Sequence, residues 1–390
     1  MIDQLFNNYF LNKKGAVRMK IKAALVKEKG APYEITELDL AEVGSKDVLV
    51  KVVASGLCRS DYGERNGNSI NFPNVLGHEG AGIVEKVGSA VTSVKPGDHV
   101  ILSYAYCGEC KHCVEGHPSS CEKWFTVNNL GKNPRGEFIL HTEDGTEVNN
   151  FFNQSSFSTY SLTEESNVVK AGKDVDLRLL GPLGCGLGTG SGAVLSVLQP
   201  KVGEGIAVFG TGAVGFAAVM AAKIAGCYPI VAIDINDQRL EKAKELGASH
   251  VFNSKEADPE KFIKDLTDGR GLDYVIDSTG VGPVMTKALH SVSNSGTFVP
   301  LAVTQKNFEV NTFFDLVFGN KKVRGVLIGD TIAKYHLPNL IDFYKRGEFP
   351  FDQFIKFYDF ENINQAEADS ISGEVIKAVV VMDKDYQPPK

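Results

Sequence analysis

Short apolar runs separated by polar and turn-forming residues dominate the first half of the chain. Four of these runs are rich in Val and Ile and are bounded by Gly, Pro or Asp, which is typical of β-strands. They cover residues 20–26, 47–54, 80–87 and 98–102. Pro96, Gly97 and Asp98 give a turn signal at the start of the last run. We therefore expect a mainly antiparallel, partly closed β structure with long excursions between its strands.

Near Pro200 the pattern changes to strands that alternate with helices. The apolar run 205–209 is followed by a glycine turn and by residues 213–225, which are rich in Ala and Val and long enough for a buried helix. A charged helix is expected at 239–246, where Gly247 is a good stop signal. Further strands are expected at 230–233, 272–276, 297–301 and 323–328. This alternation predicts right-handed crossovers and a doubly wound parallel sheet, so the fold class is α/β.

The end of the chain carries two more expected elements. Residues 360–364 are expected to be helical, and the apolar run 375–382 is expected to be a final strand. Apolar and polar positions alternate poorly in that strand. We expect it to return to the domain formed by the first half of the chain.

The glycine turn has the spacing G-x-G-x-x-G, at Gly210, Gly212 and Gly215. It follows an expected strand, opens an expected helix and precedes Asp234 at the end of the next strand, which is the context that a dinucleotide-binding turn requires. Gly210 permits the tight turn, Gly212 lets the pyrophosphate approach the backbone, and Gly215 lets helix and strand pack closely. The alternative is a glycine-rich turn that binds no ligand. Such a turn would not need the preceding strand, the following helix and the acidic residue together.

Asp234 is expected to select the cofactor. A carboxylate at this position accepts hydrogen bonds from the ribose hydroxyls and repels a 2′-phosphate, and no Arg directly follows it. The expected cofactor is therefore NAD in preference to NADP. Arg239, five residues further on, is either a ribose contact that weakens this preference or a solvated charge on the helix.

Four of the seven cysteines have a spacing typical of a metal site. Cys107, Cys110, Cys113 and Cys121 can close a tetrahedral shell of four thiolates around a zinc ion. The alternative is a disulfide knot, but a chain of 390 residues buries enough core to need no such crosslinks. We expect this structural zinc to order a loop at about 104–124.

Cys58 and Cys185 flank this cluster at long range, and His78 lies between them in the sequence. Two thiolates and one imidazole leave one position of a tetrahedral zinc open, and that open position separates a metal that does chemistry from a metal that holds a loop. We therefore expect two zinc ions per chain.

Composition argues against several other classes of function. The net charge of −7 is unsuited to non-specific nucleic-acid binding, which needs clustered Lys and Arg. No run of about 18 apolar residues is present, so we expect no membrane span. Residues 1–18 are polar and lack the apolar core of a signal peptide. We expect a frayed extension there, a natural start at either Met1 or Met19, and a cytoplasmic location.

Together these motifs resemble those of the zinc-dependent medium-chain alcohol dehydrogenases, and they occur in that family's order from Met19 onward. The resemblance is carried by the cysteine cluster, the nucleotide motif and three short runs: Cys58-Arg59-Ser60-Asp61, Gly77-His78-Glu79-Gly80, and residues 181–186 around Cys185. Within the family, residues 151–157 and 181–186 look most like the aryl (benzyl) alcohol dehydrogenase branch.

The resemblance implies catalytic roles for matching residues. Cys58, His78 and Cys185 would bind the catalytic zinc, and Glu79 would lie beside it as an occasional fourth ligand. Asp61 would orient His78, because a metal-bound imidazole usually needs a hydrogen-bond acceptor on its other nitrogen.

Further roles concern the proton and the cofactor. Ser60 would hydrogen-bond the substrate hydroxyl and pass on its proton, although a serine in such a place more often bonds its local backbone. Arg59 and Lys377 would meet the pyrophosphate of NAD. Thr189 and Val214 would pack beside the nicotinamide.

The resemblance also implies the domain plan and assembly. A GroES-like, mainly antiparallel β catalytic domain would span 1–187 and 329–390, and a Rossmann domain that binds NAD would span 188–328. Relatives are dimers or tetramers, so we expect a homo-oligomer in which sheet edges of the nucleotide domain pair across subunits.

One departure from the family pattern concerns the proton. Many relatives have a histidine five residues after the first zinc cysteine, and here that position is Gly63. We expect protons to leave through the ribose and water, and we expect no relay histidine in the pH profile.

The expected activity is the reversible oxidation of a primary aryl or allylic alcohol to its aldehyde, with hydride transfer to NAD. Aromatic residues at 103–106 and 151–157 favour an apolar pocket, although core packing also explains them. One alternative is a relative that acts on aliphatic alcohols, polyols or a formaldehyde–thiol adduct. An alternative of another class is a non-catalytic NAD-binding scaffold, which should tolerate loss of the open-shell ligands.

Overall fold

The computed structural model describes residues 9–11 and 17–389. Backbone contacts divide the chain into two compact units. The first is Met1–Cys185 with Ile332–Pro338 and Asp352–Lys390, and the second is Gly186–Thr331 with Asn339–Phe351. The extension expected at 1–18 lies mostly outside the described residues. Within it the structure has a short strand, β1 (Tyr9–Leu11), paired antiparallel with β2 (Val17–Val26), which the polar composition did not predict.

The unit boundary falls inside a helix near the end of the chain. The sequence placed all of 329–390 with the first unit, whereas 339–351 belongs to the second. Helix α11 (Ala333–Lys345) contains Pro338, and Leu340 and Ile341 just after it are buried. An amphipathic pattern predicts that a helix buries one face, but it does not say against which core.

Two sheets form the first unit. Beyond β1 and β2, their strands are β3 (Glu34–Leu40), β4 (Asp47–Gly56), β5 (Asn74–Val75), β6 (Gly80–Val87), β7 (His99–Leu102), β8 (Leu140–His141), β9 (Glu147–Asn150), β10 (Tyr160–Glu164), β11 (Val168–Ala171), β18 (Ile355–Asp359) and β19 (Lys377–Val381). One sheet has the order β1-β2-β3-β8-β9-β5 and is closed by a pairing of β5 with β2. The other has the order β11-β7-β6-β4-β19-β18, with β10 also paired to β4. Most pairs are antiparallel, which confirms the predicted β architecture, and β5–β9 and β18–β19 are parallel.

The strands predicted for the first half are present. The run 80–87 coincides with β6, and the other three match β2, β4 and β7 to within three residues at one end. The last strand, β19, pairs antiparallel with β4, so the end of the chain returns to the first unit as predicted. Leu57 N–H, just past β4, donates to Ala378 O at 2.9 Å. This contact brings Lys377 beside the loop that carries Cys58.

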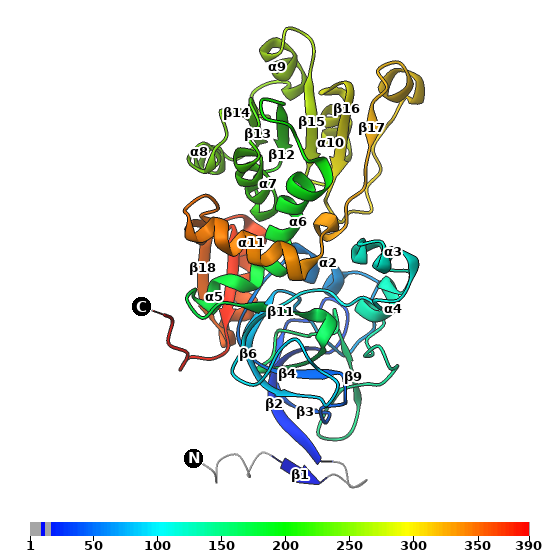
Figure 1. Ribbon diagram of the computed structural model, residues 1–390, viewed down its shortest axis with the longest axis vertical. Coiled ribbons are helices and arrows are strands. Elements are labelled where there is room, and N and C mark those ends of the chain that lie inside the picture. Colours follow the sequence, from blue (N-terminus) through cyan, green and yellow to red (C-terminus); the bar gives the residue numbers. More distant parts are fainter. Residues whose placement is uncertain (1–8, 12–16, 390) are drawn as a thin grey trace. The chain divides into compact units, whose positions relative to one another are not determined.

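The second unit is built on one parallel sheet of order β14-β13-β12-β15-β16-β17. Its strands are β12 (Ile206–Phe209), β13 (Ile230–Asp234), β14 (His250–Asn253), β15 (Leu272–Asp277), β16 (Val292–Pro300) and β17 (Lys322–Val323), drawn in green to orange in Figure 1. The helices between them are α7 (Ala213–Ile224), α8 (Asp237–Leu246), α9 (Pro259–Leu266) and α10 (Gly282–His290). The strand order reverses direction at β12, which confirms the predicted doubly wound sheet. In sheets of this kind, ligands bind at the carboxyl ends of the strands where the order reverses, which here is the end of β12.

Two predicted elements near the end differ from the structure. The strand expected at 323–328 shrinks to β17, and Arg324, Gly325 and Leu327 are exposed. An apolar run forms a buried strand only where other elements cover it. The residues of this run do not indicate that it lies at the edge of a sheet, so the sequence overestimated its length. The helix expected at 360–364 continues as α12 (Ile363–Ser372), which ends at Gly373 with φ 85°.

Among the described residues, no single helix is long and apolar enough to cross a membrane. One bent pair, Leu177–Gly184 with Gly186–Leu198, meets the criteria of length and composition across a bend of 56°.

Candidate active site

Helix α2 (Arg59–Asn66) starts at Cys58 and fixes two predicted site residues. Cys58 is the N-cap and has extended backbone, with φ −110° and ψ 150°. Asp61, in the first turn, reaches back so that its Oδ2 accepts a hydrogen bond from Cys58 N–H at 3.0 Å. This reciprocal cap holds the helix start in one conformation. It therefore sets the position of the Cys58 side chain relative to the Asp61 carboxylate.

The other oxygen of Asp61 holds His78. Asp61 Oδ1 accepts hydrogen bonds from His78 Nδ1 at 2.9 Å and from Gly77 N–H at 3.1 Å, and the carboxylate and imidazole are buried. An ionised carboxylate only accepts hydrogen bonds, so Nδ1 carries the proton and the lone pair of a neutral His78 lies on Nε2. That Nε2 is buried and has no hydrogen-bond partner of normal geometry among the described residues. A buried acceptor without a partner is costly, and a metal ion at this point would satisfy it.

Cys58, His78 and Cys185 converge on one point. Their candidate ligand atoms all lie within 4.8 Å of one another. Zinc binds sulfur at about 2.3 Å and imidazole nitrogen at about 2.0 Å, so the ligands of one tetrahedral ion lie roughly 3–4 Å apart. The three residues therefore fit a zinc ion with small adjustments, and the free lone pair of His78 supplies the nitrogen ligand.

Close backbone packing brings Cys185 to this point. Cys185 follows the 3₁₀ turn Gly181–Gly184. A Cβ on Gly181 would lie 2.1 Å from Glu79 O, and a Cβ on Gly184 would lie 2.2 Å from Leu102 O. Only glycine fits at both positions, so the glycines of this run let the turn lie directly on β6 and β7 and present its cysteine to His78.

The two thiols differ in acidity. The pKa of Cys58 is held well below its usual range, chiefly by a hydrogen bond from Cys185 and also by the nearby positive charge of Lys377, despite its burial. The pKa of Cys185 is raised well above its usual range because it donates that hydrogen bond and is buried. A lowered pKa favours the thiolate form of Cys58, which is the form that binds a metal.

Glu79 and Lys377 form a buried ion pair next to this centre. Lys377 Nζ lies 2.8 Å from Glu79 Oε2 and 3.0 Å from Oε1, and it donates to Leu57 O at 3.0 Å. Burial raises the pKa of Glu79, and the Lys377 charge opposes that rise. Glu79 and Cys58 raise the pKa of Lys377 against the effect of burial. All three N–H donors of Lys377 are engaged, so a pyrophosphate contact would require it to leave Glu79.

The other predicted residues of α2 lie at its exposed side. Ser60 Oγ is 3.7 Å from Cys58 Sγ, and Arg59 is exposed. Gly63 is also exposed, and a Cβ added there would meet nothing within 4 Å. The position that carries a histidine in many relatives therefore has room for one in this chain.

Aromatic rings surround the imidazole of His78. Phe151 meets it edge-on with ring centroids 5.4 Å apart, and Phe152 packs against it at 4.7 Å. Trp124 lies 6.0 Å from Phe152 and 4.8 Å from Tyr104. The first unit therefore places a cluster of flat apolar groups next to the candidate metal ligands.

The four-cysteine cluster is compact and contains no disulfide. All seven cysteines are free thiols. Cys110 Sγ lies 3.5 Å from Cys113 Sγ, and Cys107 Sγ lies 3.9 Å from Cys113 Sγ, distances far longer than an S–S bond. Backbone N–H groups of Glu122 and Cys113 lower the pKa of Cys110 to about 6. Four sulfurs in this arrangement, which is completed by Cys121, suit a closed zinc shell.

The glycine turn of the second unit has the geometry of a dinucleotide-binding turn. Gly210 has φ 88°, a conformation that side chains rarely adopt. A Cβ on Gly215 would lie 1.9 Å from Gly210 O, and a Cβ on Gly212 would meet nothing within 4 Å. Gly215 is therefore needed for packing, whereas Gly212 leaves open space at the start of α7, where backbone N–H groups can bind phosphate.

Asp234 ends β13 beside this turn. Its Oδ2 accepts hydrogen bonds from Thr211 N–H and Thr211 Oγ1, both at 2.7 Å. Its Oδ1 accepts from the N–H groups of Ile235 at 2.7 Å and Asn236 at 3.1 Å. These four donors fix the carboxylate at the edge of the turn. Arg239 lies on α8, where its N–H is capped by the Asn236 side chain at 3.2 Å.

The two residues expected beside the nicotinamide also lie in the second unit. Thr189 belongs to α6 (Gly186–Gly192) and Val214 to the first turn of α7. A Cβ on Gly190 would lie 2.0 Å from Val214 O, so the two helices are in backbone contact. The structure therefore brings Thr189 and Val214 into one neighbourhood.

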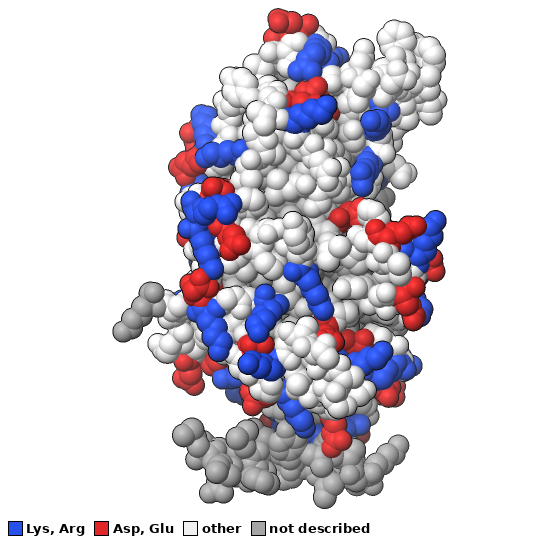
Figure 2. Space-filling view, in the orientation of Figure 1, with Lys and Arg blue, Asp and Glu red and all other residues white. Residues whose placement is uncertain are grey.

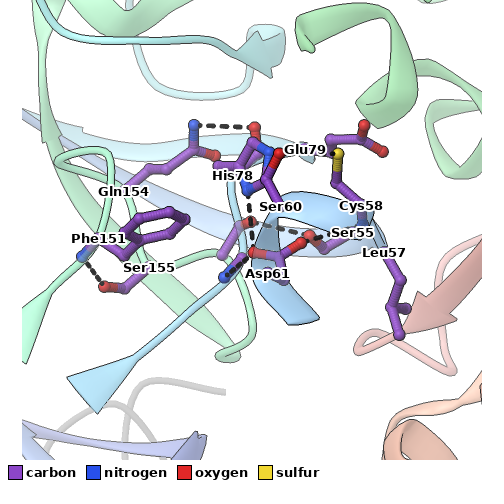
Figure 3. Close-up of polar contacts among 12 residues, drawn as sticks. Ser55, Leu57, Cys58, Ser60, Asp61, His78, Glu79, Phe151, Gln154 and Ser155 are labelled. Atoms are coloured by element: carbon purple, nitrogen blue, oxygen red, sulfur yellow. Dashed lines mark hydrogen bonds and ion pairs between the residues drawn. The ribbon is translucent and has the colours of Figure 1, made fainter. Parts of the chain in front are cut away.

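Sequence reasoning missed one residue close to the centre. Gln154 is buried, and its Nε2 donates to His78 O at 3.2 Å and to Ser103 O at 3.0 Å. Figure 3 shows it beside His78, on the side away from Cys58. A glutamine in a serine-rich run gives no functional signal by itself, and both of these partners are distant in sequence.

This fold and these metal-binding clusters define a class of zinc-binding, nucleotide-dependent dehydrogenases. Residues 44–173 match the family model described as the alcohol dehydrogenase GroES-like domain, and residues 213–346 match the model described as zinc-binding dehydrogenase. The chain belongs to the zinc-binding alcohol dehydrogenase family, whose members use zinc and NAD(H).

Individual relatives agree with this assignment. Geraniol dehydrogenase of Castellaniella defragrans is 37% identical over 92% of this chain and 97% of its own length. The crystal structure of benzyl alcohol dehydrogenase from Acinetobacter calcoaceticus matches with a TM-score of 0.88 and 42% identity, over 93% of this chain and 99% of that one. An alcohol dehydrogenase zinc-binding domain protein from Burkholderia ambifaria matches with a TM-score of 0.91 and 40% identity, over 94% of this chain and all of that one.

Proposed function

We propose that this protein reversibly oxidises primary aryl or allylic alcohols to aldehydes with NAD as the hydride acceptor. The convergence of Cys58, His78 and Cys185 around the unpartnered Nε2 of His78 carries this proposal. The names of the geraniol and benzyl alcohol dehydrogenases, an allylic and an aryl case, give it further support.

Each residue near the centre has a defined task. Asp61 holds Nδ1–H of His78, so the imidazole keeps the tautomer and direction that a metal ligand needs. A zinc ion bound by Cys58, His78 and Cys185 would supply the Lewis acidity that brings the pKa of an alcohol toward neutrality. NAD would supply the ring that accepts hydride. Ser60 Oγ would hydrogen-bond the substrate hydroxyl and take on its proton. Because Gly63 has no side chain that could accept this proton, the proton would pass to the ribose and water.

The aromatic cluster supports the proposed substrate class. Phe151 and Phe152 contact the His78 ring, and Trp124 and Tyr104 extend the cluster. Flat apolar groups favour a planar substrate, since offset and edge-to-face ring contacts stabilise beyond simple burial. The two phenylalanines that contact His78 offer no hydrogen bonds to the hydroxyl groups of a polyol.

A substrate panel tests this function. With purified protein that holds two zinc ions, kcat/KM with NAD should be at least about tenfold higher for benzyl alcohol and geraniol than for ethanol and sorbitol, because each buried ring or isoprenoid group adds apolar contact. Higher kcat/KM for ethanol or sorbitol would favour the alternatives for aliphatic alcohols or polyols. Bound NADH without turnover of any alcohol, in a protein with one zinc, would favour the non-catalytic scaffold.

We propose two zinc ions per chain, one at Cys58, His78 and Cys185 and one in the loop of four cysteines. The open position of the first suits a substrate oxygen, and the closed shell of the second suits a structural role. Among aliphatic, polyol and formaldehyde–thiol substrates, no described contact favours one as a second candidate.

We propose NAD in preference to NADP. Asp234 presents a fixed carboxylate at the turn, which repels a 2′-phosphate. The ratio of kcat/KM for NAD to that for NADP should exceed about tenfold, a differential binding energy of about 1.4 kcal/mol. A higher kcat/KM with NADP would show that Arg239 overrides Asp234.

We also propose a homo-oligomer, with the edge of the parallel sheet at β17 as its interface. The segment before β17 exposes large apolar side chains, and Phe313, Phe314, Val317 and Phe318 are 53–72% exposed. Figure 2 shows the projection at the upper right as a surface without charged side chains. Apolar exposure on this scale marks an interaction site. The expected cytoplasmic location stays a prediction.

A further inference from the structure

The segment after β9 has an unusual backbone. Phe152, Asn153 and Ser155 have φ of 53°, 49° and 44°, and none of them is glycine. Non-glycine residues in this left-handed region are strained, most of all bulky ones such as Phe. Strained backbone persists only where the surrounding structure imposes it, and it gathers at functional sites.

Buried hydrogen bonds impose this shape. Asn153 Nδ2 donates to Asn167 Oδ1 at 3.1 Å, and Asn167 Nδ2 donates to Phe152 O at 3.0 Å. Ser155 Oγ donates to Val75 O at 2.7 Å and accepts from Phe151 N–H at 3.0 Å. These side chains are at least 97% buried. The strained turn is therefore held by a network of its own, apart from the metal ligands.

The shape presents Gln154 to the backbone around His78. Gln154 Nε2 donates to His78 O at 3.2 Å and to Ser103 O at 3.0 Å, and its Oε1 accepts from Gly80 N–H at 3.3 Å. One side chain thus ties the start of β6 to the end of β7. The turn also packs Phe151 and Phe152 against the imidazole. A single turn therefore contacts both the backbone and the ring of His78 (Figure 3).

We propose that Gln154 is a positioning residue for the catalytic centre. Asp61 fixes one ring nitrogen of His78, but a hydrogen bond to a ring does not fix the Cα from which the ring extends. Gln154 fixes the peptide groups on both sides of Glu79. Together they keep His78 Nε2 aimed at the point shared with Cys58 and Cys185, which is the geometric precision that a metal site demands of its supporting residues. This inference rests on the proposed zinc site.

Asn128 offers a matched control. Its Nδ2 donates to Ala105 O and Trp124 O, both at 3.0 Å, and its Oδ1 accepts from Ala105 N–H at 2.9 Å. It is buried as deeply as Gln154, at 1% exposure. Like Gln154, its side chain bonds two backbone carbonyls and one backbone N–H, but these partners lie at the two ends of the cysteine loop. Its link to the strained turn is through its backbone, since Asn128 O accepts from Phe152 N–H at 2.8 Å, and the substitution leaves that backbone group in place.

The test compares Gln154→Glu with Asn128→Asp. Each change keeps the side-chain shape and one acceptor but places an oxygen against two carbonyl oxygens. Gln154→Glu should speed transfer of one zinc per chain to a chelator by at least about tenfold and lower kcat by at least about tenfold, while the Kd for NADH stays within about twofold. Asn128→Asp should leave kcat within about twofold. Gln154→Asn keeps the amide but shortens its reach, and it carries the same prediction if the glutamate variant does not fold.

Two results would overturn the inference. In one, folded Gln154 variants hold zinc and turn over as the unaltered protein does. In the other, Asn128→Asp lowers kcat as much as Gln154→Glu does, so that the loss reflects any damaged buried amide. The proposed function fails in a different way, because the unaltered protein itself would then lack the second zinc or alcohol oxidation.

Discussion

At the scale of single residues, one hydrogen bond decides the chemistry of His78. Asp61 accepts from Nδ1, so Nε2 is left to face two sulfurs. If Asp61 were absent, the imidazole could take either tautomer and could rotate. The same carboxylate caps the helix that begins at Cys58, so one aspartate orders two of the three expected ligands.

Replacing one ligand should separate chemistry from cofactor binding. Cys58→Ser should lower kcat at least about a thousandfold, because Lewis-acid stabilisation of several kcal/mol is lost. The Kd for NADH, measured by fluorescence titration, should change by less than about threefold. Cys227→Ala, which alters a buried cysteine of the second unit, is the control and should keep its activity. Near-normal turnover by a Cys58→Ser protein of verified metal content would remove Cys58 from the catalytic shell.

Gly63 gives a prediction about the proton route. The unaltered protein should show no ionisation near pH 6.5 in its kcat/KM profile, because no relay histidine follows Ser60. Gly63 is exposed, and a Cβ added there meets nothing within 4 Å, so Gly63→His is a suitable variant. A relay histidine accepts a proton only when neutral, so the variant should gain activity as pH rises through about 6.5.

The control for that profile is Gly63→Ala, which adds a Cβ without an imidazole. His141 is a candidate proton acceptor by residue type alone, so it is replaced as well. A titration near pH 6.5 in the unaltered protein that survives His141→Ala would speak against the proposed route. An unchanged profile in Gly63→His would show that the proton does not pass this position.

Residue-level prediction from sequence worked where spacing carries chemistry. The tight spacing of Cys107, Cys110 and Cys113 predicted the compact cluster that the structure contains. The partner of Lys377 was not predictable, since its contact with Glu79 spans 298 residues. No motif near Glu79 or Lys377 in the sequence predicts this ion pair.

At the scale of elements, turns and caps bring the site together more than the long strands do. The start of α2 presents Cys58, the Gly181–Gly184 turn presents Cys185, and the strained turn at Gln154 supports His78. Strands β12 and β13 were predicted because buried apolar runs have a strong pattern. The strand expected at 323–328 failed because a sheet edge leaves the same kind of run exposed.

The cysteine loop should act as a separable structural element. Cys110→Ser removes one thiolate of four, so the protein should lose one zinc per chain and several kcal/mol of local stability. Its Tm in differential scanning calorimetry should fall by about 5–10 °C. The activity of the protein that remains folded should persist at low temperature. A variant as stable as the unaltered protein would refute the structural role of this zinc.

At the scale of the whole molecule, the chain makes two units whose cores are separate. The sequence was least able to predict which unit the residues after Thr331 belong to. The apolar pattern of α11 predicts a buried face, but the same face could pack on the core of either unit. The proposed assembly likewise depends on exposed apolar side chains, and no sequence motif marks them.

The apolar segment before β17 should set the oligomeric state. Phe314, 67% exposed, should be buried between subunits, so Phe314→Glu should shift the mass measured by light scattering toward the monomer. Phe125→Glu, at a residue 52% exposed just after the cysteine loop, is the control and should leave the mass unchanged. A Phe314→Glu protein that keeps the unaltered mass would place the interface elsewhere.

The most direct test of the whole account is anomalous diffraction from crystals of the fully zinc-loaded protein, recorded on both sides of the zinc absorption edge. The account predicts two peaks per chain. One peak should be bonded to Cys58 Sγ, His78 Nε2 and Cys185 Sγ with a fourth position left for a small molecule, and the other should lie among the four clustered cysteines. A single peak at the cysteine cluster, with Cys58, His78 and Cys185 apart, would contradict it.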